Sequence, residues 1–387
     1  MIARHLLGDA YPVRRLETVV EFLDHKRRPV TESERTIGSY PYYGANGQQG
    51  WIGDYLFDEP LILLAEDGGH FDAPERGVAY RIQGKSWVNN HAHVLRPTDE
   101  VDIGFLCRML ENYDLTPYVT GTTRGKLTKA GASEILVLVP PLLEQRRIAA
   151  ILDQAETLRT QRRAALAQLD ELAQSIFLDM FGDPTSNPKK WPMFDVGALA
   201  EVQGGIQVTA ARKNLPLELP YLRVANVYRG YLNLSEIKMI RATSAEVSRT
   251  LLMEDDLLVV EGHGNPNEIG RSALWTGEIA RCVHQNHIIR ARFDSKKVSP
   301  TYACEYLNSP GGRRHLLRAG KTTSGLNTIS VSNVREAPIA LPPLTLQKLF
   351  AARVKAIEAL KATHSAALAE LDALFASLQH RAFAGSL

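Results

Sequence analysis

An internal repeat constrains the fold of this chain more than any other feature of its sequence. The stretch AALAQLDEL at residues 164–172 returns as AALAELDAL at 366–374, 202 residues later. At the same offset, VPPLLEQRRIAAILDQAETL (139–158) matches LPPLTLQKLFAARVKAIEAL (341–360). Each copy begins with Pro-Pro, which is favoured where a helix starts, and continues for about forty residues without Pro or Gly. The repeat therefore predicts two related helices of roughly 60 Å each.

Both predicted helices have a heptad pattern with one polar interruption. Inward positions follow one another at alternating intervals of three and four residues, as a coiled coil requires. If the helices pair antiparallel over their full length, Arg162 and His364 meet at the midpoint and fix the register. Alternatively, Arg162 extends toward solvent and His364 merely packs. The predicted seam comprises Ile148, Ile151, Leu158, Arg162, Leu169, Leu172, Ile357, Leu360, His364, Leu371, Leu374 and Leu378.

A larger globular segment precedes each helix, and the two segments share short motifs. GTTRGKLT (121–128) corresponds to KTTSGLNT (321–328), and NHAHVLR (90–96) corresponds to HQNHIIR (284–290). Both segments show short strands and helices, so we expect a mixed α/β (α+β) fold. Two globular domains are separated by two long helices that pair as an antiparallel coiled coil, with pseudo-twofold internal symmetry. The expected boundaries are 1–140, 141–182, 183–342 and 343–387.

Glycine-rich loops follow apolar strands in both globular segments. PLILLAEDGG (60–69) and DDLLVVEGHGNPNEIG (255–270) each predict a buried strand that ends in such a loop. Asn46-Gly47 predicts a tight turn, and YLRVANVYRGYLNL (221–234) predicts a hairpin that turns at Arg229-Gly230. Exposed backbone N–H groups let such loops approach a polyanion, although they are also found as ordinary turns.

Composition and missing motifs exclude several function classes. Hydrophobic residues make up 44% and charged residues 23%, as in ordinary soluble proteins. We expect no signal peptide, no membrane span, no metal site and three reduced cysteines. GTTRGK is too short for a phosphate-binding loop, no dinucleotide-binding or nucleophile motif is present, and no methyltransferase motif is found. The chain is therefore expected to carry no catalytic machinery and to bind no cofactor itself.

Several of these motifs, taken together, resemble the specificity subunits of type I restriction-modification systems. They are PYYGANGQQGWI with LLAEDGG, YLRVANV with DDLLVVEG and IGRSAL, and the TTRGKLT and TTSGLNT segments that lead into each Pro-Pro helix. The resemblance implies a non-catalytic protein of the prokaryotic cytoplasm, active in DNA methylation and phage defence. Its two target-recognition domains each read half of a split, asymmetric sequence in double-stranded DNA, and its helices set the gap.

The resemblance also implies protein partners. The helices dock two adenine-N6 methyltransferase subunits, which supply the S-adenosylmethionine site, and a restriction subunit with translocase and nuclease activity is a further candidate. Two alternatives remain: a coiled-coil scaffold whose modules bind proteins, and a metal-dependent nuclease. About 15 Lys and Arg against about 19 Asp and Glu in residues 1–140 make the first domain acidic. We therefore expect partner subunits to clamp the DNA while this chain reads it.

The candidate DNA-binding residues follow from this resemblance and from side-chain chemistry. Arg can bind guanine with two hydrogen bonds, and Asn can do the same with adenine. The repeated Thr-Thr pairs suit phosphate positioning, with a turn or helix cap as the alternative. The candidates are Asn46, Gly47, His91, Thr122, Thr123, Arg124 and Lys126 in the first segment, and Arg223, Asn226, His263, Asn265, Lys321, Thr322 and Thr323 in the second.

Overall fold

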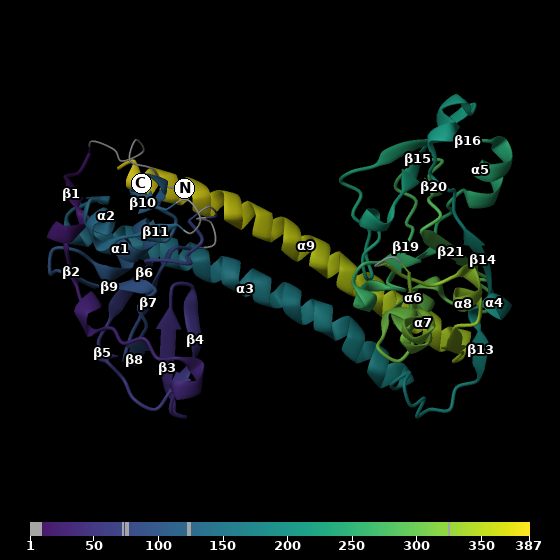
Figure 1. Cartoon of the computed structure of the whole chain (residues 1–387), viewed down its shortest axis with the longest axis horizontal. Helices are drawn as coiled ribbons and strands as arrows, with labels where there is room; N and C mark the ends of the chain where they lie inside the picture. Colours follow the sequence, from purple (N-terminus) through teal and green to yellow (C-terminus); the bar gives the residue numbers. More distant parts are fainter. Residues whose placement is uncertain (1–9, 72, 74–76, 122–124, 324–325) are drawn as a thin grey trace. The chain divides into compact units, whose positions relative to one another are not determined.

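The chain folds into two compact units, each built around one of the repeated segments (Figure 1). The computed structural model describes residues 10–71, 73, 77–121, 125–323 and 326–387. Unit 1 combines the chain up to Ala164 with His364–Leu387, and unit 2 is Ala165–Thr363. Each long helix therefore contributes one half to each unit. The predicted mixed α/β fold with two long paired helices is confirmed.

Unit 1 contains two four-stranded sheets. One has the order β2-β9-β6-β7, formed by Val20–Phe22, Ala92–Pro97, Leu61–Ala65 and Ala79–Ile82. The other has the order β4-β3-β8-β5, formed by Gly47–Ile52, Tyr40–Gly44, Lys85–Val88 and Phe57–Asp58. The remaining elements are β1 (Val13–Arg15), β10 (Val119–Thr120), β11 (Lys126–Leu127), β12 (Leu136–Leu138), α1 (Ile103–Leu110) and α2 (Lys129–Ser133). As predicted, the strand at 61–65 is fully buried.

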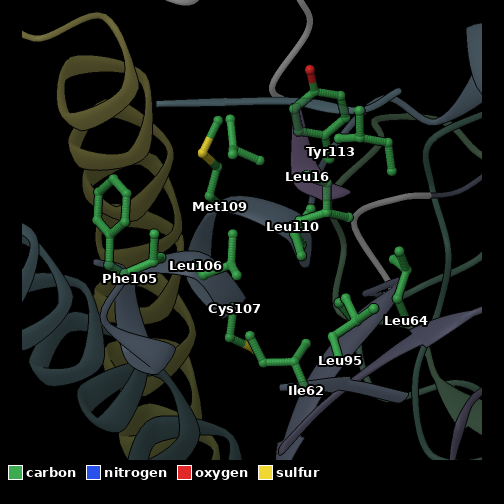
Figure 2. Close-up of a cluster of buried hydrophobic side chains, with 14 of the residues drawn as sticks. Leu16, Ile62, Leu64, Leu95, Phe105, Leu106, Cys107, Met109, Leu110 and Tyr113 are labelled. Atoms are coloured by element: carbon green, nitrogen blue, oxygen red, sulfur yellow. The ribbon is translucent and has the colours of Figure 1, made fainter. Parts of the chain in front are cut away.

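Helix α1 connects the first sheet of unit 1 to the long helices. Asp102 caps the helix, because its carboxylate accepts a 3.0 Å hydrogen bond from the backbone N–H of Phe105. Figure 2 shows the side chains of α1 beside Ile62 and Leu95 of the sheet. On the other side, the rings of Phe105 and Phe383 lie 5.8 Å apart, which places α9 in the same core.

In the part of the chain that the structure describes, unit 2 is built from one four-stranded and two three-stranded sheets, with an aromatic cluster in its core. Its sheet orders are β14-β21-β17-β19, β16-β15-β20 and β18-β23-β22, with the pair β13-β24. The strands are Met193–Asp195 (β13), Ala200–Gly204 (β14), Leu217–Leu222 (β15), Lys238–Ala242 (β16), Leu257–Val260 (β17), Gly262–His263 (β18), Ser272–Leu274 (β19), Val283–His284 (β20), Ile288–Phe293 (β21), Lys321–Thr323 (β22), Leu326–Thr328 (β23) and Pro338–Ala340 (β24). The short helices are Val196–Leu199 (α4), Ser244–Thr250 (α5), Pro300–Asn308 (α6), Arg314–Ala319 (α7) and Val331–Arg335 (α8).

The long helices are α3 (Leu142–Phe181) and α9 (Leu344–Phe383), of 40 residues each. A buried glutamine anchors the first turn of both. Gln145 donates to the Pro140 carbonyl at 2.7 Å and accepts from the Asp102 backbone N–H at 2.7 Å. Gln347, its counterpart 202 residues later, donates to the Pro342 carbonyl at 2.7 Å. The repeat thus extends to individual hydrogen bonds.

The seam of the helix pair differs from the predicted one at every second position. Four predicted seam residues are between 42% and 51% exposed, namely Leu158, Leu172, Leu360 and Leu374. The residue that follows each of them is buried or half-buried instead. Arg159, for example, donates to Asp372 at 2.6 Å and lies 4.3 Å over the ring of Phe375. Counted from Ile148, the inward-facing residues therefore follow one another at alternating intervals of four and three residues. The predicted order was three and then four.

The polar interruptions of the two helices do meet. Arg162 Nη1 donates to His364 Nδ1 at 3.0 Å, and both side chains belong to unit 1. The predicted contact is thereby confirmed, and the antiparallel direction is also seen in unit 2, where Lys361 lies 2.7 Å from Asp170. A role of Arg162 and His364 in fixing the register stays a prediction.

The position of one predicted turn and the length of one predicted hairpin need correction. The loop between β3 and β4 is Ala45-Asn46, one residue earlier than Asn46-Gly47, because Gly44 pairs with Gly47. The hairpin predicted over 221–234 is shorter, since β15 ends at Leu222. Its turn at Arg229-Gly230 is confirmed, because Val227 and Leu232 form an antiparallel bridge around it and the Tyr228 backbone N–H donates to the Tyr231 carbonyl at 3.0 Å. Among the residues that the structure describes, no helix combines the length and the apolar character that crossing a membrane requires.

A buried histidine makes the stability of unit 2 depend on pH. Burial lowers the pKa of His284 from 6.5 to about 4, while its Nδ1 donates to the Ile288 carbonyl at 2.9 Å. The folded pKa lies below the unfolded one, so the stabilisation is complete above pH 6.5 and is lost as the pH falls toward 4. We expect a loss of about 3 kcal/mol over this window. His284→Gln should flatten the pH dependence of the urea midpoint, followed by tryptophan fluorescence.

The exposed His25 provides the control for this experiment. His25→Gln should keep the pH dependence of the parent chain. An unchanged pH profile in His284→Gln would contradict the assignment to His284.

Candidate functional site

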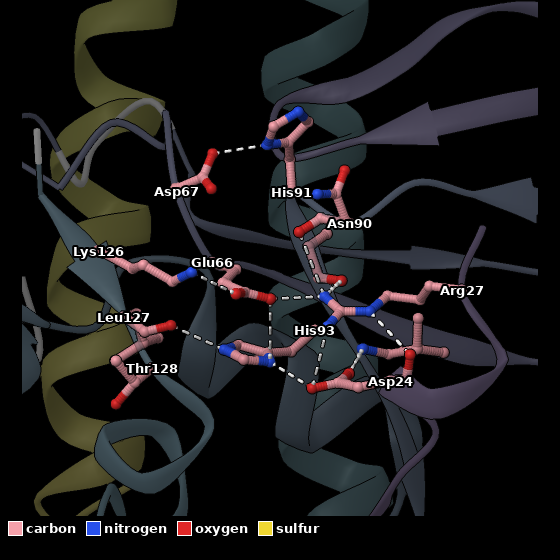
Figure 3. A network of polar contacts seen from close by, with 12 residues as sticks. Asp24, Arg27, Glu66, Asp67, Asn90, His91, His93, Lys126, Leu127 and Thr128 are labelled. Carbon is pink, nitrogen blue, oxygen red and sulfur yellow. Dashed lines mark hydrogen bonds and ion pairs between the residues drawn. The ribbon is translucent and has the colours of Figure 1, made fainter. Parts of the chain in front are cut away.

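Three of the predicted residues converge on the loop that follows strand β6 of unit 1. Asn46 Nδ2 donates to the Gly68 carbonyl at 2.9 Å. His91 Nδ1 lies 2.6 Å from Asp67 Oδ1, and Lys126 Nζ lies 3.1 Å from Glu66 Oε1 (Figure 3). The three side chains come from a turn, from the start of β9 and from β11. The structure thus assembles one exposed polar surface, the loop surface of unit 1, from segments far apart in the sequence.

A buried polar network supports this loop surface from below. Arg27 Nη1 donates to Glu66 Oε2 at 2.6 Å (Figure 3). His93 places Nδ1 2.7 Å from Asp24 Oδ2 and Nε2 2.8 Å from the Leu127 carbonyl oxygen. Burial alone raises the pKa of the Glu66 carboxyl, but hydrogen bonds from Arg27 and Lys126 outweigh it and lower the pKa. Glu66 therefore stays ionised and holds both cations in place.

The same network contains a group of potential metal ligands. Asp24, Glu66 and His93 offer ligand atoms within 4.8 Å of one another. Arg27 and Lys126 already contact Glu66, however, so protein cations neutralise its carboxylate. These residues do not fit a metal ion, because a divalent cation next to two fixed positive charges is repelled.

Unit 2 repeats the arrangement with different side chains. Glu261 and His287 form a pair at 3.0 Å. The strand register makes His287 the counterpart of His91, not of His93 as the sequence alignment predicted, because the backbone N–H of Glu66 donates to the His91 carbonyl and that of Glu261 donates to the His287 carbonyl. Strand β18 pairs with β23, so His263 lies opposite Asn327, and β23 in turn separates it from β22, which carries the second Thr-Thr pair. We call the surface that these residues form after the end of β17 the loop surface of unit 2. The predicted Lys321, Thr322 and Thr323 form β22.

The structure gives local roles to other predicted residues. His263 Nδ1 accepts a hydrogen bond from the Asn265 backbone N–H at 3.0 Å, and the exposed Asn265 caps its own turn by accepting from the Asn267 backbone N–H at 3.0 Å. Gly47 opens β4 with a φ of +110°, which favours glycine. Thr122, Thr123 and Arg124 lie outside the described residues.

Asn226 is the clear correction among the predicted DNA contacts. Its side chain is 2% exposed. It accepts from the Arg223 backbone N–H at 2.8 Å and donates to the carbonyls of Asn233 and Glu236 at 2.8 and 3.0 Å. An amide buried in this way shapes its own chain segment and cannot reach a base. Arg223 pairs with Glu236 at 3.0 Å beside it.

The sequence interpretation missed Glu66 and Arg27, the two residues that hold the loop surface of unit 1. They are 39 residues apart; Glu66 lies in the LLAEDGG stretch but was not singled out, and Arg27 belongs to none of the motifs. The only available signal was the shared LLAE and LVVE stretches of the two segments, at 63–66 and 258–261.

Among their described residues, the loop surfaces offer hydrogen-bonding groups and no activated nucleophile. All three cysteines are buried. Burial raises the pKa of Cys107 and Cys282 to about 12 and raises that of Cys304 as well, so these thiols stay protonated at neutral pH. What remains at the surfaces is an exposed amide, a lysine and histidines, which suit contacts to phosphates and base edges.

Comparison with solved structures gives the class of fold. The S subunit of a type I restriction-modification system from M. genitalium superposes with a TM-score of 0.59 at 14% identity, covering 96% of each chain. A chain from a structure on complex assembly and conformational transition of the type I R-M system gives a TM-score of 0.56 at 17% identity, covering 98% of this chain and 99% of that one. The fold is that of a type I S subunit.

Comparison with sequences gives the relatives that this chain resembles. The model of the type I restriction modification DNA specificity domain matches residues 9–168. A putative type I specificity subunit of Haemophilus influenzae is 34% identical over 156 residues, which is 40% of this chain and 40% of that protein. The EcoKI specificity subunit of Escherichia coli is 24% identical over 76% of this chain and 68% of its own length. The StySPI specificity subunit of Salmonella potsdam is 26% identical over 84% and 74%. Over most of its length this chain is thus similar to type I restriction-modification specificity subunits.

Proposed function

We propose that this chain is the DNA-recognition subunit of a type I restriction-modification complex. Unit 1 reads one half of a split, asymmetric target in double-stranded DNA, and unit 2 reads the other half. The chain is non-catalytic. Two adenine-N6 methyltransferase subunits, which bind S-adenosylmethionine, dock on it in the bacterial cytoplasm, and a restriction subunit is a further candidate partner.

The observation that carries this proposal is the pair of loop surfaces, one in each unit. Both lie where an apolar strand ends, at β6 and β17, and both combine a glycine-rich loop with a strand from the Thr-Thr motif. Their frameworks match, while the side chains on them differ. Two related frameworks with different hydrogen-bonding groups are what reading two different half-sites requires.

The charges of the loop surface in unit 1 argue for help from a partner. Lys126 is held by Glu66, and His91 lies against Asp67. Phosphates must compete with these carboxylates, so the isolated chain is expected to bind DNA weakly. Affinity grows with the number of phosphates neutralised, and partner subunits supply the missing contacts.

The exposed apolar residues of the long helices support docking of protein partners. Leu158, Leu172, Leu360 and Leu374 lie at solvent-facing heptad positions of α3 and α9. Repeated leucines beside the seam of a helix pair are suited to pack against further helices.

The test is a genome-wide map of methylated adenines in a host that expresses this chain with its methyltransferase subunit. We expect a two-part motif that disappears when the chain is omitted. Replacing residues 183–342 by the corresponding domain of a relative should change one half of the motif and leave the other half intact, because each unit reads its own half.

Two controls accompany the methylation map. The relative's domain is introduced with its own sequence motif already mapped, and chain levels are matched by immunoblot. Methylation that is independent of the chain, despite an active methyltransferase bound to it, would contradict the proposed function and favour a protein-binding scaffold.

A further inference from the structure

Unit 2 contains a cavity that the loop surface does not use. Its volume is about 820 Å³, and its wall is formed by α3, α9, the end of α6 and the turn around Gly230. This volume lies within the range of sites that hold small molecules, about 300–1,000 Å³. Acidic residues, two arginines and a tyrosine line it.

The acidic residues of the lining include a carboxyl group that lacks a donor among the described residues. Lys361 is shared between Asp170 and Glu358, at 2.7 and 3.0 Å. In the part of the chain that the structure describes, no hydrogen bond or ion pair reaches the carboxyl of Glu305. Burial raises its pKa, and the charge of Glu358 raises it further. Glu305 is therefore placed to accept hydrogen bonds from a ligand.

The lining also contains two arginines that repel each other. Arg229 donates to the Asn267 carbonyl at 3.1 Å. Burial lowers the pKa of Arg229, and the charge of Arg313 lowers it further. Arg313 also lines the cavity, and within the described residues its guanidinium has neither a hydrogen bond nor an ion pair. Arg229 also forms an ion pair with Glu268 at 3.9 Å, which leaves Arg313 as the guanidinium of this pair that has no counter-ion among the described residues. Such an arginine beside a second one suits an anion such as phosphate.

An aromatic stack forms the wall next to the arginines. Tyr231 stacks on Tyr228, with ring centroids 5.0 Å apart and an angle of 10° between the planes. The guanidinium of Arg271 lies 4.9 Å from the Tyr228 centroid and backs the stack. Tyr231 lines the cavity and is 59% exposed, so its second face is available to a flat ring.

The internal repeat shows how the same place is closed in unit 1. Aligning Cys107 of α1 with Cys304 of α6 places Arg108 where unit 2 has Glu305. Arg108 donates to Asp153 at 2.6 Å and forms an ion pair with Glu111 at 2.9 Å. In unit 1, the side chain at this position thus forms ion pairs within the unit. In unit 2, the carboxyl group at the same position faces a cavity.

We propose that this cavity binds a nucleotide. The base stacks on Tyr231, its N–H groups donate to Glu305, and its phosphate lies between Arg229 and Arg313. A nucleotide supplies the flat ring, the donors and the anion that the three parts of the cavity lack. Guanine fits best, because two adjacent N–H groups on one edge match the two oxygens of a carboxylate. A free nucleotide and a nucleotide within a DNA strand offer the same chemistry.

The test is calorimetric titration of the purified full chain with GMP, with AMP and inorganic phosphate as comparators. We expect one saturable GMP site. Arg313→Ala should weaken GMP binding by about tenfold or more, because a charge-assisted contact to phosphate is lost. Glu305→Arg, which copies unit 1, should abolish GMP binding, and Glu305→Gln should weaken it while leaving phosphate binding unchanged.

The matched control is Arg314→Ala, since Arg314 is exposed and does not line the cavity. It should bind GMP like the parent, and thermal unfolding checks that every variant is folded. A short single-stranded oligonucleotide distinguishes a free nucleotide from a nucleotide within a DNA strand. If the oligonucleotide binds and GMP does not, and if Arg313→Ala abolishes binding of the oligonucleotide, the site is assigned to a DNA strand. The proposal is overturned if neither GMP nor the oligonucleotide binds in a manner that depends on Arg313 and Glu305. These titrations need no methyltransferase, so their outcome is independent of the methylation map.

Discussion

Phe350→Ala should lower the free energy of unfolding of unit 2 by about 3–5 kcal/mol, the usual cost of deleting a buried phenylalanine side chain. Phe350 is fully buried at the start of α9, where its ring lies 5.6 Å from that of Phe177 and 5.4 Å from that of Phe181. The substitution leaves a cavity among rigid rings that cannot collapse onto it. Urea unfolding monitored by tryptophan fluorescence measures the effect.

The neighbouring residue is the matched control for this experiment. Leu349 is 48% exposed, so Leu349→Ala should change the stability by about 0.5 kcal/mol or less. Ile148, 202 residues before Phe350, holds the equivalent position in unit 1, and Ile148→Ala should destabilise that unit instead. Equal effects of Phe350→Ala and Leu349→Ala would show that the aromatic cluster does not hold unit 2 together.

Replacing the exposed leucines of the helix pair with lysine should prevent assembly with the methyltransferase. Leu158→Lys with Leu374→Lys alters unit 1, and Leu172→Lys with Leu360→Lys alters unit 2. Because these side chains are exposed and lysine is a good helix former, the chain should fold normally. We expect each double variant to bind the methyltransferase about 100-fold more weakly or worse, since a buried interface disfavours unpaired charges.

Co-purification and calorimetry of the variants with the methyltransferase subunit measure this loss. Ala164→Lys with Ala366→Lys adds the same two charges at exposed positions on other faces of the helices and should assemble normally. Full assembly of both leucine variants would exclude these leucines from the interface. The methylation map tests DNA recognition by the two units separately.

The long helices could be predicted from the sequence, but the phase of their seam could not. Proline, glycine and the repeat define where the helices run. Both possible phases offer leucines and alanines, and the prediction chose the more apolar one. The structure instead turns Arg159 and Lys361 inward, because each meets an aspartate of the opposite helix, Asp372 or Asp170. Such pairs depend on the alignment of two helices, which one helix alone does not reveal.

The candidate site could be predicted only at the level of motifs. Glycine-rich loops and Thr-Thr segments were recognised in both segments, and the structure brings them together by strand pairing. The partners of Asn46 and Lys126 lie tens of residues away and follow from the sheet order. Asn226 was misjudged because an asparagine in a turn serves the backbone as readily as it serves a base.

The division of the chain also determines the order in which it can fold. Unit 2 is one continuous stretch, whereas unit 1 needs Phe375 and Phe383 of α9 in its core. The ribosome makes these residues only after all of unit 2. During synthesis the apolar faces of α1 and of the first half of α3 wait uncovered for some two hundred residues, about ten to forty seconds of translation. Unit 1 is therefore the part of the nascent chain that most needs a chaperone, although its sequence begins first.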